Sequence, residues 1–208
     1  QVAIDAGHIE ITTDPRRITA ARDVRTVMMP AAKDASSPGG QIRRAGMLER
    51  DQPVYAAAAA LDYDSAARLA VYTADPPAQA RLWQGDTTIQ ADRLTVDDAT
   101  GNLAGKGSVA TTFMIEETDE KTGTRERTPT IGRADAFLYD DGPRTATYTG
   151  SAHVSGPQGD LEASRIELFL ATEVSELERL EAYTAIALRD AMRVVSGDRL
   201  TYTAADGR

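Results

Sequence analysis

Hydrophobic and polar residues alternate along most of the chain, and the pattern recurs at intervals. Residues 4–11, 89–96 and 161–168 each read apolar, x, Ala, x, x, apolar, x, apolar. Alternation with a period of two indicates half-buried β-strands. Within each copy the phase shifts by one residue, as between Ala91 and Leu94, and such a shift indicates a bulge or a sharp corner. Because three copies share the shift, we predict that the corner belongs to the architecture.

Tyrosines mark a second recurring pattern. Tyr72 follows Tyr63 by nine residues, Tyr148 follows Tyr139 by nine residues, and Tyr202 begins a further copy. Clusters of Asp, Asn, Gly and Pro separate the strand-like segments and are typical of hairpin turns. Internal repeats of this kind predict one supersecondary unit that stacks on copies of itself. We therefore predict an all-β chain of repeated strand units.

Three segments do not follow this pattern simply. Residues 175–192 are rich in helix formers, but their repeat partner over residues 102–109 is glycine-rich, so the repeat favours a strand and leaves a short helix near Ser175 as the alternative. Residues 28–50 are predicted to be a flexible insertion, and residues 116–133 a long loop or an extended hairpin. The whole of residues 1–208 is predicted to form one domain, apparently cut in mid-repeat.

Composition narrows the function classes. The 208 residues are 41% hydrophobic and 26% charged, which is typical of a globular domain with a core. The formal net charge of −9 disfavours a nucleic-acid binder, and no apolar run is long enough to cross a bilayer. The absence of cysteine excludes disulfides, thiolate metal sites and cysteine nucleophiles. Because the chain begins at Gln1, we expect a mature or excised piece.

Candidate catalytic and metal-binding residues are sparse. His8 and His153 lie in different repeat units, with no motif of a hydrolase or a metalloprotease around either. The acidic pairs at residues 97–98 and 140–141 coincide with predicted turns, where aspartate is common for structural reasons. We therefore expect no catalytic residues, no metal site, no cofactor and no enzymatic activity.

Two stretches carry a resemblance to a known family, LDYDSAARLAVYTADPPAQARLWQGDTTIQADRLTVDDATGNLAGKGSV and AFLYDDGPRTATYTGSAHVSGPQGDLEASRIELFL. They resemble the OstA-like family of lipopolysaccharide transport, to which LptA, LptC and the periplasmic domain of LptD belong. The resemblance covers roughly residues 2–27, 54–115 and 133–208. It implies a twisted antiparallel β-jelly-roll that is open at both ends and binds lipopolysaccharide between two sheets. It also implies a periplasmic location, with a possible inner-membrane tether outside this chain.

The resemblance assigns roles to apolar positions that the strand pattern alone would place in a core. Residues expected to line a groove for the acyl chains of lipid A are Ile9, Ile11, Leu61, Tyr63, Tyr72, Ile89, Leu94, Val96, Val109, Phe137, Tyr139, Tyr148, Leu161, Ile166 and Leu168. Leu200 and Tyr202 are expected to pair, edge to edge, with other lipopolysaccharide-transport proteins or with copies of the chain. The alternatives are a structural scaffold or adhesion module with a sealed core and, less favoured, a carbohydrate-active enzyme.

Overall fold

The computed structural model describes residues 2–30, 45–118, 125–156, 159–171, 176–190 and 193–204, leaving aside the side chains of residues 116–118, 125 and 126. These residues form fourteen strands: β1 (Val2–Asp5), β2 (His8–Thr13), β3 (Arg16–Met28), β4 (Val54–Asp64), β5 (Leu69–Thr73), β6 (Ala80–Gln84), β7 (Thr87–Ala91), β8 (Arg93–Asp97), β9 (Leu103–Thr118), β10 (Arg125–Asp140), β11 (Thr145–Gly156), β12 (Gly159–Leu170), β13 (Leu177–Arg189) and β14 (Val194–Thr203). No helix in the described part of the chain is long and apolar enough to cross a membrane.

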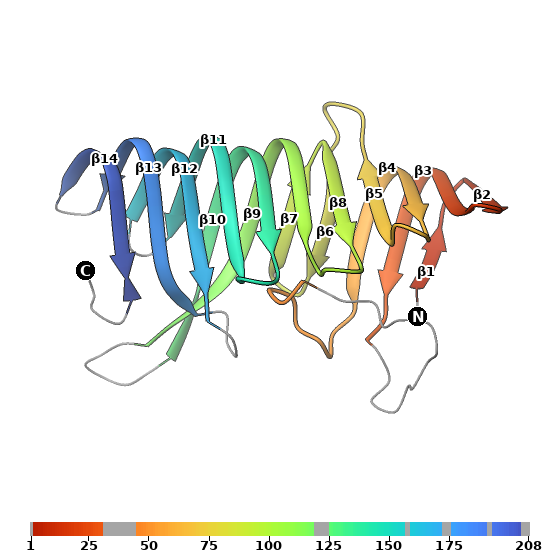
Figure 1. Cartoon of the computed structure of the whole chain (residues 1–208), viewed down its shortest axis with the longest axis horizontal. Coiled ribbons are helices and arrows are strands. Elements are labelled where there is room, and N and C mark those ends of the chain that lie inside the picture. Colours follow the sequence, from red (N-terminus) through yellow and green to blue (C-terminus); the bar gives the residue numbers. More distant parts are fainter. Residues whose placement is uncertain are drawn as a thin grey trace.

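All the strands belong to one antiparallel sheet. Its main path runs β1-β3-β4-β5-β8-β9-β10-β11-β12-β13-β14, while β2 pairs with β3, and β6 and β7 bridge β4 and β9. Hairpins connect most neighbours, as the alternating pattern and its turn residues predict. Figure 1 shows the strands side by side along the long axis, from β1 and β2 at one end to β14 at the other. The all-β prediction is confirmed.

The sheet folds over on itself along its whole length. Residues 55–57 of β4 pair with β6, whereas residues 60–64 of the same strand pair with β5. Layer A therefore contains β1, β6, β7 and the adjoining halves of the longer strands, and layer B contains β2, β5, β8 and the other halves. The bends run along the top of Figure 1 and the turns between neighbouring strands lie at the bottom, and the side that carries these turns is called the mouth. This arrangement is the predicted twisted antiparallel β-jelly-roll.

The corners lie where the hydrophobic phase shifts. Ala91 ends β7 and Arg93 begins β8, so the shift after Ala91 marks the step from layer A to layer B. On β9 the register with β10 breaks at the corresponding corner, where Gly107 and Ser108 adopt left-handed backbone angles (φ of 77° and 47°). A Cβ at Gly107 would collide with Asp92. The predicted architectural corner is thus a strand bend that re-aims alternate side chains into the interior.

The irregular segments have clear placements where they are described. Residues 177–189 form β13, so the repeat overrode helix propensity here, and Ser175 lies outside the described residues. Much of residues 116–133 lies in β9 and β10, whose pairing runs from Thr118 and Arg125 inward, while residues 119–124 are not described. Residues 31–44 of the predicted insertion are likewise not described, but residues 45–48 pack into the interior.

Candidate functional site

An apolar cavity of about 330 Å³ lies between the layers at the β14 end of the molecule. Its lining is mostly aliphatic and comes from both layers: Ile115, Thr130, Val154, Gly156, Gly159, Leu161, Leu168, Leu177, Leu180, Leu188, Val195, Leu200, Thr201 and Tyr202, with Asp190 and Arg193. The charged members sit in the turn between β13 and β14. There the backbone N–H of Arg193 donates to Asp190 Oδ1 at 2.7 Å, and Arg193 Nε donates to Asp190 Oδ2 at 3.0 Å. Charge is therefore confined to the rim.

The central part of the interior is closed by tyrosines that cross from layer B to layer A. The hydroxyls of Tyr148 and Thr111 are 2.7 Å apart, and those of Tyr72 and Thr26 are 2.9 Å apart, so each pair forms a buried hydrogen bond. Burial raises the pKa of Tyr72 to about 12 and raises that of Tyr148 further. Both hydroxyls are therefore neutral at physiological pH, and each pair ties the layers together.

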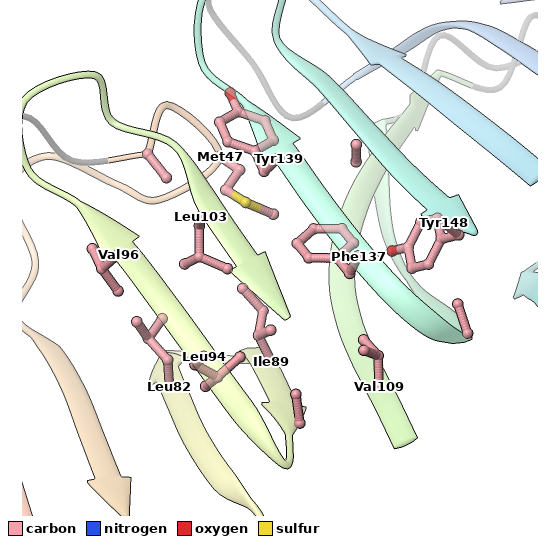
Figure 2. Close-up of a cluster of buried hydrophobic side chains, with 14 of the residues drawn as sticks. Met47, Leu82, Ile89, Leu94, Val96, Leu103, Val109, Phe137, Tyr139 and Tyr148 are labelled. Atoms are coloured by element: carbon pink, nitrogen blue, oxygen red, sulfur yellow. The ribbon is translucent and has the colours of Figure 1, made fainter. Parts of the chain in front are cut away.

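The residues around these tyrosines leave no spare room. A Cβ at Gly132 of layer A would collide with the ring of Tyr148, so the tyrosine needs a glycine opposite it. Phe137 packs against Tyr148 with ring centroids 5.1 Å apart. Figure 2 shows these aromatic rings and the aliphatic side chains of β7 to β9 pointing into one cluster. The centre is therefore a packed apolar core.

At the β14 end, larger apolar residues stand where the centre has Thr111 and Gly132. Strand pairing places Thr111 opposite Gly132, and Leu188 opposite Val195 at the corresponding point of β13 and β14. Among the described residues, none pairs with β14 on its outer side, so no tyrosine stands opposite Leu200 as Tyr148 stands opposite Phe137. The apolar cavity lies between the layers at this point.

Most of the predicted groove residues lie in the closed part. Those that are fully or almost fully buried there are Leu61, Tyr72, Ile89, Leu94, Val96, Val109, Phe137, Tyr139, Tyr148 and Ile166, with Tyr63 half-buried beside them. Two further predicted residues, Leu161 and Leu168, line the cavity. Leu200 and Tyr202 line it too, although the sequence suggested only a pairing role for them.

Ile9 and Ile11 lie at the opposite end of the molecule, on β2. Ile9 pairs with the buried Ala20, and cross-strand partners share a face, so both isoleucines are on the interior side of layer B. They are nevertheless 42% and 64% exposed, because β2 is the last strand of layer B. They do not contact the cavity near β14, and they form an exposed apolar strip at the N-terminal edge.

Several cavity residues were not among the expected groove positions. Leu177, Leu180 and Leu188 belong to β13, whose many helix formers obscured its alternation, and Val195 is on β14. The signal that could have found them is the repeat itself. Aligned on Val109, the copy ending at Ile186 places Leu188 at the position of Thr111.

The acidic turn residues have structural roles. Asp97 Oδ1 accepts hydrogen bonds from the backbone N–H groups of Ala99 and Thr100 at 2.8 and 3.1 Å, and Asp140 Oδ1 accepts one from Gly142 at 3.2 Å. These are side-chain-capped turns, as predicted. Within the described ranges, no group of three or more potential metal-ligating His, Asp or Glu side chains comes together.

Comparison with known proteins identifies a family for this chain. The family model described as "LptA/(LptD N-terminal domain) LPS transport protein" matches residues 79–208. Among solved structures, one similar chain is LptH, the LptA-homologous periplasmic component of the lipopolysaccharide transport device of Pseudomonas aeruginosa. It is 16% identical, with a TM-score of 0.49 and coverage of 73% of this chain and 94% of that one. No curated protein matches by sequence.

Proposed function

The chain belongs to the LptA/LptD N-terminal domain family of lipopolysaccharide transport proteins, and from this membership we propose that it holds acyl chains of lipopolysaccharide in the cavity near β14. The family is one of transport components, and the resemblance seen in the sequence is confirmed. The proposed site of action is the periplasm. Within this function, we propose two steps: binding of acyl chains and assembly into a bridge.

One observation carries the proposal: an apolar cavity between the layers, whose charged lining residues, among those that the structure describes, lie at the rim. Burying an acyl methylene stabilises a complex by about 0.8 kcal/mol, so the binding free energy grows with each methylene that enters the cavity. Sugar and phosphate groups would remain in water at the rim, beside Arg193. The net charge of −9 offers no general attraction to an anionic glycolipid, so acyl burial must supply most of the binding energy.

Photo-crosslinking tests the proposal at single residues. A photoreactive amino acid at Leu180, on the cavity wall, is expected to capture lipopolysaccharide. The same group at Leu94, which is fully buried in the closed centre, is the matched control and is expected to capture none. The proposal is wrong if Leu180 and a second wall position, Leu200, both fail to capture lipopolysaccharide in a folded protein.

Assembly through the end strands is the second part of the proposal. Among the described strands, β14 pairs only with β13, and β1 and β2 pair only with β3, so both ends present unpaired backbone groups. Such edges favour strand addition by another sheet. Val194 is 74% exposed on β14, and Ile11 is 64% exposed on β2. Joining such edges would continue the layers and bury apolar residues now in water.

Cysteine crosslinking tests this assembly, because the chain has no cysteine of its own. We expect a mixture of the variants Ile11→Cys and Tyr202→Cys to form heterodimers with a short bismaleimide. A mixture of Arg81→Cys with Tyr202→Cys serves as the control, because Arg81 is exposed on β6 within the sheet and not on an end strand. Equal crosslinking in both mixtures would contradict pairing through the end strands.

A further inference from the structure

Residues 45–48 form a strap across the mouth between the layers, below the closed centre. They come from the connection between β3 and β4, which belongs to the layer A side, and they lie at the bottom of Figure 1. Ala45, Met47 and Leu48 are all at least 92% buried. In Figure 2 the side chain of Met47 points inward, toward Leu103 and Phe137. The strap therefore inserts a side chain into the interior from the open side of the fold.

Hydrogen bonds attach the strap to both layers. The backbone N–H of Gly46 donates to Asp141 Oδ1 at 2.6 Å, in the turn between β10 and β11 of layer B. On the layer A side, the backbone N–H of Glu49 donates to Gln84 Oε1 at 2.6 Å, and Gln84 Nε2 donates to the carbonyl of Glu49 at 2.9 Å. The strap thus bridges the mouth and keeps Met47 in place.

Met47 lines a small space next to the inner end of the cavity described above. A small space of about 20 Å³ adjoins that cavity, because Ile115 and Leu168 line both. Met47 forms another wall of the small space, together with Phe113 and Leu170. An acyl chain that extended inward past Ile115 and Leu168 would therefore meet Met47.

One polar group next to the strap is destabilised while the strap is in place. The hydroxyl of Tyr139 is buried and has no hydrogen-bond partner among the described residues. It faces the strap, since a Cβ built on Gly46 would lie 3.1 Å from it. A buried hydroxyl without a partner is destabilising, so moving the strap away would let water reach this group and would offset part of the cost of opening.

We propose that Met47 is the inner stop of the cavity and sets the length of acyl chain that fits, with the strap as its removable support. This inference rests on the proposed acyl-chain function and deepens it. When the strap is in place, the cavity ends at Met47. When the strap is displaced, the space that Met47 occupies between Leu103 and Phe137 joins the cavity.

The test is a binding series of saturated fatty acids, from octanoic to stearic acid, with the full chain. We expect affinity for the wild-type protein to rise about fourfold per methylene and then to level off at one chain length. Met47→Ala is expected to move that break to longer acids, by at least a tenfold gain for the longest. Met47→Leu keeps a similar side-chain volume and should retain the break. Met29→Ala is the matched control, because Met29 is 48% exposed.

A second variant opens the strap without touching the cavity lining. A Cβ at position 46 would lie 2.7 Å from Asp141 Oδ1, which accepts the hydrogen bond from the strap, so we expect Gly46→Ala to weaken this attachment and also to move the break. The inference is overturned if the variants bind the acids but level off at the wild-type length. If the wild-type protein binds no acid at all, the proposed function fails as well.

Thiol labelling tests the strap independently of any lipid. Cysteine at position 47 would be the only thiol in the chain. We expect Met47→Cys to react with a maleimide at least tenfold more slowly than Met29→Cys, and the additional change Gly46→Ala to remove most of this protection. Equal reaction rates at positions 47 and 29 would show that the strap does not close the mouth.

Discussion

The centre and the β14 end of this molecule are built from the same repeat but have opposite interiors. In the centre, Tyr148 crosses to Thr111 and fits against Gly132. At the β14 end, the corresponding positions of layer A hold Leu188 and Val195, and a cavity of about 330 Å³ lies between the layers. The difference shows that the same repeat can enclose either a packed core or a cavity, depending on the side chains that face each other across the layers.

Truncating one leucine in each region should give the largest difference in stability between the two interiors. Leu94→Ala in the centre is expected to lower the free energy of unfolding by about 2–5 kcal/mol, because it leaves a cavity in a packed core. Leu180→Ala should lower it by about 1 kcal/mol, since Leu180 already borders empty space. Urea denaturation measures both values. Equal losses would mean that the two interiors are packed alike.

Exchanging the residues that face the crossing position should give the next largest effect. Gly132→Val is expected to destabilise the fold by about 1–3 kcal/mol, because its side chain would collide with the ring of Tyr148. Val195→Gly should change the stability by less, because Val195 is 46% exposed and, among the described residues, no aromatic ring packs against it as Tyr148 packs against Gly132. Thermal unfolding of the two variants compares them, and a larger loss for Val195→Gly would contradict the assignment.

Removing the tyrosine hydroxyl isolates the hydrogen bond from the packing of the ring. Tyr148→Phe is expected to cost about 1–2 kcal/mol, because it leaves the buried hydroxyl of Thr111 unpaired. The double variant with Thr111→Val should recover most of that loss, since both polar groups are then gone. Chemical denaturation of the four proteins of this cycle yields the coupling, and a coupling near zero would mean that the hydroxyl pair does not tie the layers together.

The smallest effect that we expect is a change of stability with pH at the mouth of the closed centre. Burial raises the pKa of Asp98, in the turn after β8, to about 6. The folded protein therefore binds this proton more tightly than the unfolded chain, whose aspartate has a pKa of about 3.9, and stability falls as pH rises from about 4 to 6. The variant Asp98→Asn should therefore be more stable than wild type at pH 7 and no more stable at pH 4. An identical gain at both values would exclude ionisation of Asp98 as the cause.

The strand pattern predicted the fold class and the corners because both depend on local periodicity. The phase shift after Ala91 is visible in eight residues, and it marks a real bend between β7 and β8. The repeat also identified β13 correctly, although its composition favours a helix. Tertiary pairing with β12 and β14 outweighs that propensity, since each of β13's halves has a partner on both sides.

The hydrophobic pattern did not predict which part of the interior is a closed core and which part is a cavity. Ile89 and Leu161 have the same place in the repeat motif, but Ile89 is sealed in the core while Leu161 lines the cavity. Which of them meets empty space depends on residues far away in the sequence, such as Tyr148 across the gap. The burial of residues 45–48 has the same origin, because the sequence around them shows turn formers and no strand pattern.

By itself, the sequence determined an antiparallel all-β ribbon, its corners, its repeat and its resemblance to lipopolysaccharide-transport proteins. These are properties of neighbours along the chain, where side-chain alternation and turn chemistry act directly. Only the tertiary structure decided which apolar residues touch one another, because contact between the layers depends on what faces each side chain across the gap. The closed centre, the cavity at β14 and the buried strap across the mouth are consequences of those contacts.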